Sequence, residues 1–160
     1  MKLRWYCLNA VAQAVLFDPQ ISNVHPAKKL KMNDLLKQVS AHIEFFGYSV
    51  QYEQGVLKAQ HPSKPSFSVH TLAGGVLFRA LFTLGSGAAD NRGELQEFLD
   101  RANGITIVSK YHTLDQTMAI DAWYPASYTK ASFGTFFEQY LADMQGPGAA
   151  LLPLADKLFS

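Results

Sequence analysis

The fold of this chain is decided by the stretch FSVHTLAGGVLFRALFTL, residues 67–84. Hydrophobic side chains occupy every second position on both sides of Gly74-Gly75, and a period of two is typical of a β-strand with one buried face. The paired glycines are typical of a tight reversal. The stretch therefore predicts an antiparallel hairpin whose second strand buries Val76, Phe78, Ala80, Phe82 and Leu84.

Two further hairpins are predicted, one on each side of this stretch. The first joins residues 48–53 to residues 56–60 through Gln54-Gly55, which is a typical two-residue hairpin turn. The second joins residues 105–112 to residues 117–124. Each of these segments alternates hydrophobic and polar side chains, so we expect six antiparallel strands with one buried face.

Three helices are predicted, because hydrophobic side chains recur at three- and four-residue steps between capping residues. The first helix is expected to start at Asn33 and end at Gly47, and the second to start at the Asn91-x-x-Glu94 capping box and end at Asn103-Gly104. The third is expected to start at Ser127 or Thr129 and end at Gly146-Pro147-Gly148. The third helix has a broad aromatic face that includes Phe133, Phe137 and Tyr140. Aromatic residues at helical spacing are most often part of a core.

The order of these elements, α-β-β-β-β-α-β-β-α, predicts an α+β fold in which a twisted antiparallel sheet carries helices on one face. We divide the chain into an N-terminal amphipathic helix and linker (1–32), a main domain (33–146) and an apolar C-terminal tail (147–160) that must dock or associate. The N-terminal segment has some features of a secretory signal. However, Asn9 and Gln13 interrupt its apolar stretch, which favours the amphipathic helix.

Composition excludes several classes of protein. The 160 residues carry a net charge of +1, which gives no electrostatic basis for a nucleic acid or anionic membrane partner. No stretch of about eighteen apolar residues exists, so we expect no membrane span. A single cysteine, Cys7, excludes an internal disulfide framework and a cysteine-rich metal site. These features predict a soluble cytoplasmic protein.

The residue spacings predict no catalytic residue, metal ligand or cofactor site. The five histidines form no metal-binding pair, and the Gly85-Ser86-Gly87 loop lacks the lysine that would follow it in a phosphate-binding loop. His70 and His112 could meet on one face of the sheet near Asp121 or Asp115, as in a small catalytic or zinc cluster. Solvated strand residues are the simpler interpretation of these side chains.

Three stretches resemble one known family. They are Phe46-Gly47-Tyr48, the helical segment LQEFLDRAN (95–103) and the strand MAIDAW (118–123). With the order of elements, they are similar over residues 33–144 to the YbjN family, described as sensory-transduction regulators, within the type III secretion chaperone-like fold. The resemblance implies a non-enzymatic regulator or chaperone-like adaptor that forms a dimer.

The uncovered face of the predicted sheet is the expected partner-binding surface. Strand parity places on this face Ser68, His70, Leu77, Arg79, Leu81, Val108, Lys110, Asp121 and Trp123. Large apolar and charged groups mixed on one surface are typical of an interface. We predict that Trp123, Leu81, Arg79, Leu77 and Val108 bind a protein partner, and that the chain forms a homodimer. The alternative is a small-molecule sensor or weak enzyme with a cleft near His70 and His112.

Overall fold

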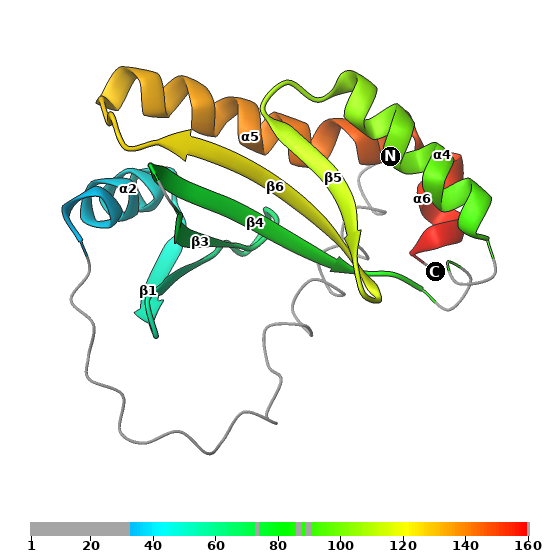
Figure 1. Ribbon diagram of the computed structural model, residues 1–160, viewed down its shortest axis with the longest axis horizontal. Helices are drawn as coiled ribbons and strands as arrows, with labels where there is room; N and C mark the ends of the chain where they lie inside the picture. The colour runs from blue at the N-terminus through cyan, green and yellow to red at the C-terminus, as the bar shows by residue number, and fades with distance from the viewer. Residues whose placement is uncertain (1–32, 73, 86–87, 89–90, 160) are drawn as a thin grey trace, which may run out of the picture.

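The computed structural model describes residues 33–72, 74–85, 88 and 91–159 (Figure 1). The predicted N-terminal helix and linker, residues 1–32, lie outside the described residues.

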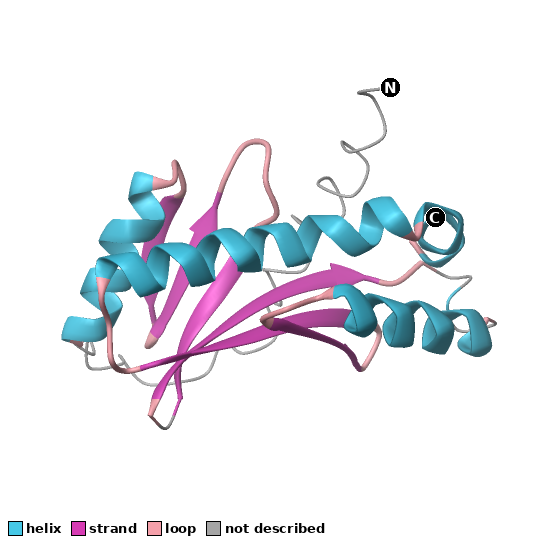
Figure 2. Ribbon diagram, turned by 90° about the horizontal axis from the view of Figure 1, so that it is seen from above, coloured by secondary structure: helices cyan, strands magenta, loops and turns pink. Residues whose placement is uncertain are grey.

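The six strands form one antiparallel sheet with the order β1-β2-β3-β4-β6-β5. The strands are β1 (Ser49–Glu53), β2 (Val56–Gln60), β3 (Phe67–Leu72), β4 (Gly75–Thr83), β5 (Ser109–Leu114) and β6 (Thr117–Pro125). The chain adds β1 to β4 one after another, then returns with β6 beside β4 and β5 at the edge. The sheet is strongly twisted (Figure 2).

The predicted turns adopt the backbone that their residues favour. Gln54 and Gly55 both have positive φ, at 51° and 86°, as a two-residue hairpin turn that follows the strand twist requires. Gly75 meets a different requirement, because a Cβ atom at this position would collide with the backbone of Tyr124 in the neighbouring strand β6.

Four described helices cover one face of the sheet. They are α2 (Asp34–Phe45), α4 (Arg92–Ile105), α5 (Lys130–Ala150) and α6 (Leu152–Leu158). α5 runs along the length of the molecule, with α2 at one end and α4 and α6 at the other (Figure 1). Asn33 caps α2 through a bond from the Leu36 amide (2.8 Å), and Thr129 caps α5. Asn91 stands at the N-cap of α4 but makes no side-chain capping bond.

An aromatic layer joins α5 to the sheet. Phe137 lies 5.7 Å from Phe67 between ring centroids, and Tyr140 lies 5.4 Å from Phe78, in edge-to-face geometries. All four side chains are almost completely buried. Aromatic pairs of this kind add about 0.5–1.5 kcal/mol each beyond the area they bury. The helix predicted to be aromatic core is therefore the centre of the fold.

The end of α5 differs from the prediction. The helix continues through Gly146-Pro147-Gly148 to Ala150. Proline lacks the N–H that would bond to the carbonyl four residues earlier, which is the Asp143 carbonyl here. The Tyr111 hydroxyl donates to that carbonyl at 2.8 Å, so the lost bond is replaced. Of the apolar tail, residues 147–150 belong to α5, and the following helix α6 packs on the fold and buries Leu158 completely.

The connection from α4 to β5 also differs from the prediction. α4 continues past Asn103-Gly104 to Ile105, and β5 begins only at Ser109. The buried carboxylate of Asp143 on α5 accepts the backbone N–H groups of Ile107, Val108 and Ser109, at 2.8–3.1 Å. The sequence segment 105–108 is consequently held in a bend by a side chain from a distant helix.

Candidate functional site

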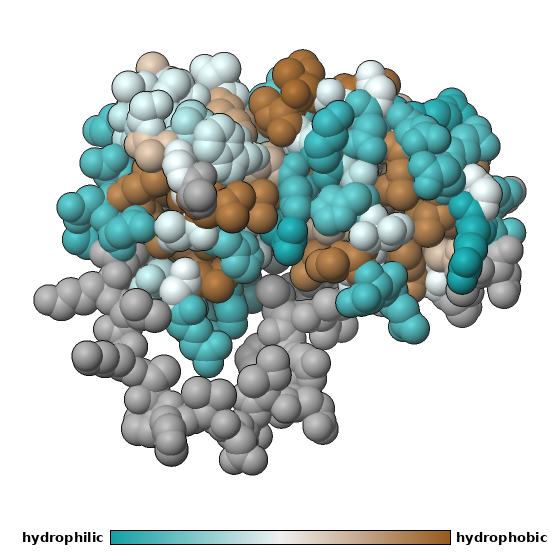
Figure 3. All heavy atoms as spheres, viewed as in Figure 1, coloured by the Kyte–Doolittle hydropathy of each residue, from teal (hydrophilic) through white to brown (hydrophobic). Residues whose placement is uncertain are grey.

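The face of the sheet that points away from the helices carries three rows of side chains, which we call the outer face. The rows follow the cross-strand pairs and are Val56-His70-Leu77-Trp123, Lys58-Ser68-Arg79-Asp121-Lys110, and Leu81-Ala119-His112. Strand parity predicted this face, and the structure places all the predicted residues of β3, β4 and β6 on it. Hydrophobic and hydrophilic residues lie in adjacent patches on the side of the molecule that Figure 3 shows.

A charged pair stands at the centre of the middle row. Arg79 donates to Asp121 through two bonds, Nε to Oδ1 at 2.8 Å and Nη2 to Oδ2 at 2.6 Å, and the His112 Nε2 atom lies 3.0 Å from Oδ2. Burial alone would raise the pKa of Asp121, but the bonds with Arg79 and then His112 outweigh it and lower the pKa. Asp121 is therefore ionised at neutral pH. A two-point arginine–carboxylate pair is geometrically rigid.

The apolar row lies beside this pair and ends in Trp123. The Trp123 side chain is 47% exposed, whereas Leu77 next to it on β4 is half-buried. Leu72 is on the same face, one row further along β3, and is 50% exposed. Sequence reasoning missed Leu72, although it has the same strand parity as Ser68. Tryptophan and arginine side chains are both enriched in protein–protein interfaces.

Val108 does not belong to the outer face, contrary to the prediction. It precedes β5, packs against the hydrophobic core, and donates its N–H to Asp143 Oδ2 at 2.8 Å. The prediction extends strand parity through a segment that is not a strand. Lys110 and His112 are the β5 residues that belong to the outer face.

The two candidate histidines lie on the outer face but in different polar groups. His70 Nε2 is 2.8 Å from the Ser68 hydroxyl, and that hydroxyl is 3.3 Å from the Arg79 carbonyl oxygen. His112 contacts Asp121. Burial lowers the pKa of His70, nearby Arg79 lowers it further, and Asp121 opposes both effects. Within the described part of the chain, no three His, Cys, Asp or Glu side chains are placed to hold a metal ion.

Two cavities are lined by other described residues. One lies between α4 and the end of β4, and the other lies between α2 and the segment before α5, beside His42 and Tyr128. Neither is lined by His70 or His112. Among the described helices, none is long and apolar enough to cross a membrane.

Comparison with known proteins identifies a similar fold. The structure matches the crystal structure of YbjN from E. coli, described as a candidate transcription regulator, with a TM-score of 0.59 and 15% sequence identity over 78% of this chain and 95% of that one. No protein-family model and none of the curated proteins matches this sequence. The chain therefore has a YbjN-like α+β fold, as the resemblance predicted.

Proposed function

We propose that this protein is a non-enzymatic regulator or chaperone-like adaptor that binds a protein partner through its outer face. The observation that carries the proposal is the exposed Trp123 indole, held on the inner strand β6 beside the Arg79–Asp121 pair. YbjN, which has the same fold, is described as a candidate transcription regulator. A regulatory role needs a surface that recognises another molecule.

Two rows of the outer face have separate roles in this proposal. Trp123 and Leu77 offer a large apolar area with few rotatable bonds, and burying such an anchor dominates the energy of many interfaces. Arg79 and Asp121 are already paired with each other, so they add little affinity. Their charges fix the orientation of the bound partner and disfavour partners with badly placed charges. Lys110 stands at one end of the middle row and favours an acidic segment of the partner, whereas Lys58 at the other end is paired with Glu53.

We further propose that the chain forms a two-fold homodimer. Trp123, Leu72 and Leu77 share one face, and apolar side chains on one surface are commonly covered in an assembly. Light scattering at tens of micromolar should give twice the 17.7 kDa mass of one chain. A clean monomer would remove the dimer but not the binding of a different protein, which crosslinking tests separately.

A photo-crosslinking residue at position 123 tests the binding surface directly. The photoreactive side chain replaces Trp123, and a control places the same group at Phe45, an 85% exposed aromatic on α2. The group at position 123 should crosslink to one protein, or to a second copy of this chain, in a defined molar ratio. Excess unmodified protein should reduce the yield of this crosslink by competing for the partner. Capture from position 45 alone would move the interface to α2 and overturn the proposal.

A weak hydrolase is a second candidate, favoured by one observation. Ser68 and His70 are within hydrogen-bond distance, as a nucleophile and its base must be. Two features weigh against it: the Ser68 hydroxyl also reaches the Arg79 carbonyl, and neither of the two cavities is lined by these residues. Hydrolysis of a nitrophenyl ester that is lost in Ser68→Ala and kept in Ser66→Ala would support this candidate.

A further inference from the structure

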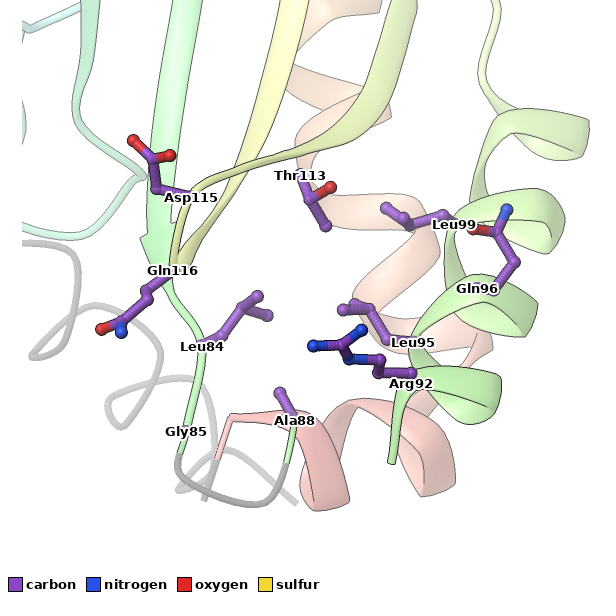
Figure 4. A pocket seen from close by; sticks show the side chains of 10 residues that line it. All are labelled: Leu84, Gly85, Ala88, Arg92, Leu95, Gln96, Leu99, Thr113, Asp115 and Gln116. Atoms are coloured by element: carbon purple, nitrogen blue, oxygen red, sulfur yellow. The ribbon is translucent and has the colours of Figure 1, made fainter. Parts of the chain in front are cut away.

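A cavity of about 610 Å³ lies between the first half of α4, the end of β4 and the turn that joins β5 to β6 (Figure 4). It is distinct from the outer face. Small-molecule sites typically enclose about 300–1,000 Å³ and combine apolar walls with a few polar groups. The size and position of this cavity are therefore suitable for a ligand.

One part of the cavity wall is aliphatic, and the rest is polar, with Gln96, Thr113 and Gln116 among its residues. Leu84 at the end of β4 faces Leu95 of α4 across the opening, and Leu99 and Ala88 complete the apolar lining (Figure 4). Leu84 and Leu95 are half-buried and pack on the core with their other sides, which fixes their positions. No aromatic side chain is among the described lining residues. Walls of this kind favour a flexible hydrocarbon body over a flat ring.

One cation stands at the mouth of the cavity. The Arg92 guanidinium points across the opening toward Leu84 (Figure 4), and it is the one cationic group among the described lining residues. Arg79 and Arg101 are paired with Asp121 and Glu97. Arg92, in contrast, makes no hydrogen bond or ion pair with the part of the chain that the structure describes. Its five donors are available to an anion.

The acidic residue at the rim does not compete for this position. In Figure 4 the Asp115 carboxylate points away from the cavity, on the turn where Asp115 has a φ of 53°. A ligand inside the cavity therefore meets the aliphatic side chains, uncharged polar groups and, at one end, the positive charge of Arg92. A guanidinium binds a carboxylate through two parallel hydrogen bonds.

We infer that this cavity binds a medium-chain aliphatic carboxylate, with the chain between Leu84, Leu95 and Leu99 and the carboxylate on Arg92. The inference is independent of the proposed partner-binding surface, because the two use different residues. Arg92 is exposed to solvent, so its contribution is moderate and specificity arises from charge and chain together.

Titration of the full chain with sodium octanoate, followed by two-dimensional NMR, tests this inference. Amides of α4 and of the β5–β6 turn should shift and saturate in the low millimolar range or below. Arg92→Gln should weaken binding about tenfold, by loss of a charge-assisted pair. The control Arg101→Gln removes an exposed arginine from the same helix and should bind octanoate as the wild type does. The NMR spectra also report whether each variant is folded.

Two further probes separate the charge from the chain. Octanol should bind more weakly than octanoate and equally well to the wild type and Arg92→Gln, while octylamine should not bind. Three results would each overturn the inference: no saturable shift with octanoate up to about 10 mM, equal octanoate affinity in Arg92→Gln and wild type, or octylamine bound as tightly as octanoate.

Discussion

Replacing Asp143 with alanine is expected to remove a large share of the stability of the fold. Asp143 is 3% exposed, and its carboxylate accepts the N–H groups of Ile107, Val108 and Ser109 and the Gln139 side-chain amide. These bonds connect α5 to the start of the edge strand β5. Alanine leaves buried donors without an acceptor and releases this connection.

The magnitude follows from the number and burial of the donors. A hydrogen bond to a charged acceptor contributes about 1.5–3 kcal/mol, and an unsatisfied buried donor costs about as much. Ser109 is buried, but Ile107 is 75% exposed, so water replaces part of the loss. We therefore expect a free energy of unfolding lower by about 3–5 kcal/mol rather than the full sum. For a domain of this size, that lowers the melting temperature by roughly 10 °C.

Urea unfolding of Asp143→Ala measures this loss. The slope of the free energy of unfolding against urea concentration should be the same as in the wild type, which shows that the same folded and unfolded states are compared. Asp100→Asn is the matched control, because Asp100 is exposed on α4 and accepts one bond, from Gln96. The control should change the free energy of unfolding by less than about 0.5 kcal/mol. A loss below about 1 kcal/mol for Asp143→Ala would refute our account of the α4–β5 connection.

Three further predictions concern titration, the sheet edge and the turns. The pKa of His70 is lowered in the folded state by burial and then by Arg79, so the unfolded chain binds protons more readily and the free energy of unfolding should fall as pH decreases through 6.5. His70→Gln should reduce this dependence on pH, as measured by urea titrations at pH 7 and 5. Asn103→Ala should cost about 2 kcal/mol and promote aggregation in light scattering, because the Asn103 amide bonds both the N–H and the C=O of Tyr111 on the edge strand β5. Gly55→Ala should lower the free energy of unfolding, measured by thermal denaturation, by about 1 kcal/mol, because Gly55 has a positive φ. Gly104→Ala should raise it by about 0.5–1 kcal/mol, because Gly104 lies within α4 and an added Cβ would contact no other atom.

Each of these predictions has a result that contradicts it. An unchanged pH slope in His70→Gln would show that burial of this imidazole has no energetic consequence. A stable and monodisperse Asn103→Ala variant would mean that the edge of β5 is protected by other means. Equal effects of Gly55→Ala and Gly104→Ala would contradict the assigned turn geometry.

Local sequence patterns predicted the elements of the fold well. Alternation fixed which side of β4 and β6 is buried, and the Asn33 and Thr129 caps and the Gln54-Gly55 turn lie where the residues indicate. These features depend on neighbouring residues alone. Trp123 is exposed for the same reason, since its strand parity opposes that of Tyr124.

The errors arose where distant residues override local preference. Pro147 remains inside α5 because Tyr111, from another element, bonds to the carbonyl that the proline leaves without a donor. Val108 leaves the outer face because Asp143 holds its N–H in a bend. No pattern within a few residues of either position contains this information. The cavity beside Arg92 depends in the same way on β4 and α4 meeting in space.

The most direct test of the central proposal is the Trp123→Ala variant, studied by unfolding and by titration with the captured partner. The half-exposed indole should contribute about 1–2 kcal/mol to stability, compared with about 3–5 kcal/mol for a core tryptophan. Partner affinity should fall by about 2 kcal/mol or more, roughly thirtyfold, and Phe45→Ala should retain it. Unchanged affinity per folded molecule in Trp123→Ala would contradict the assignment of the outer face as the binding surface.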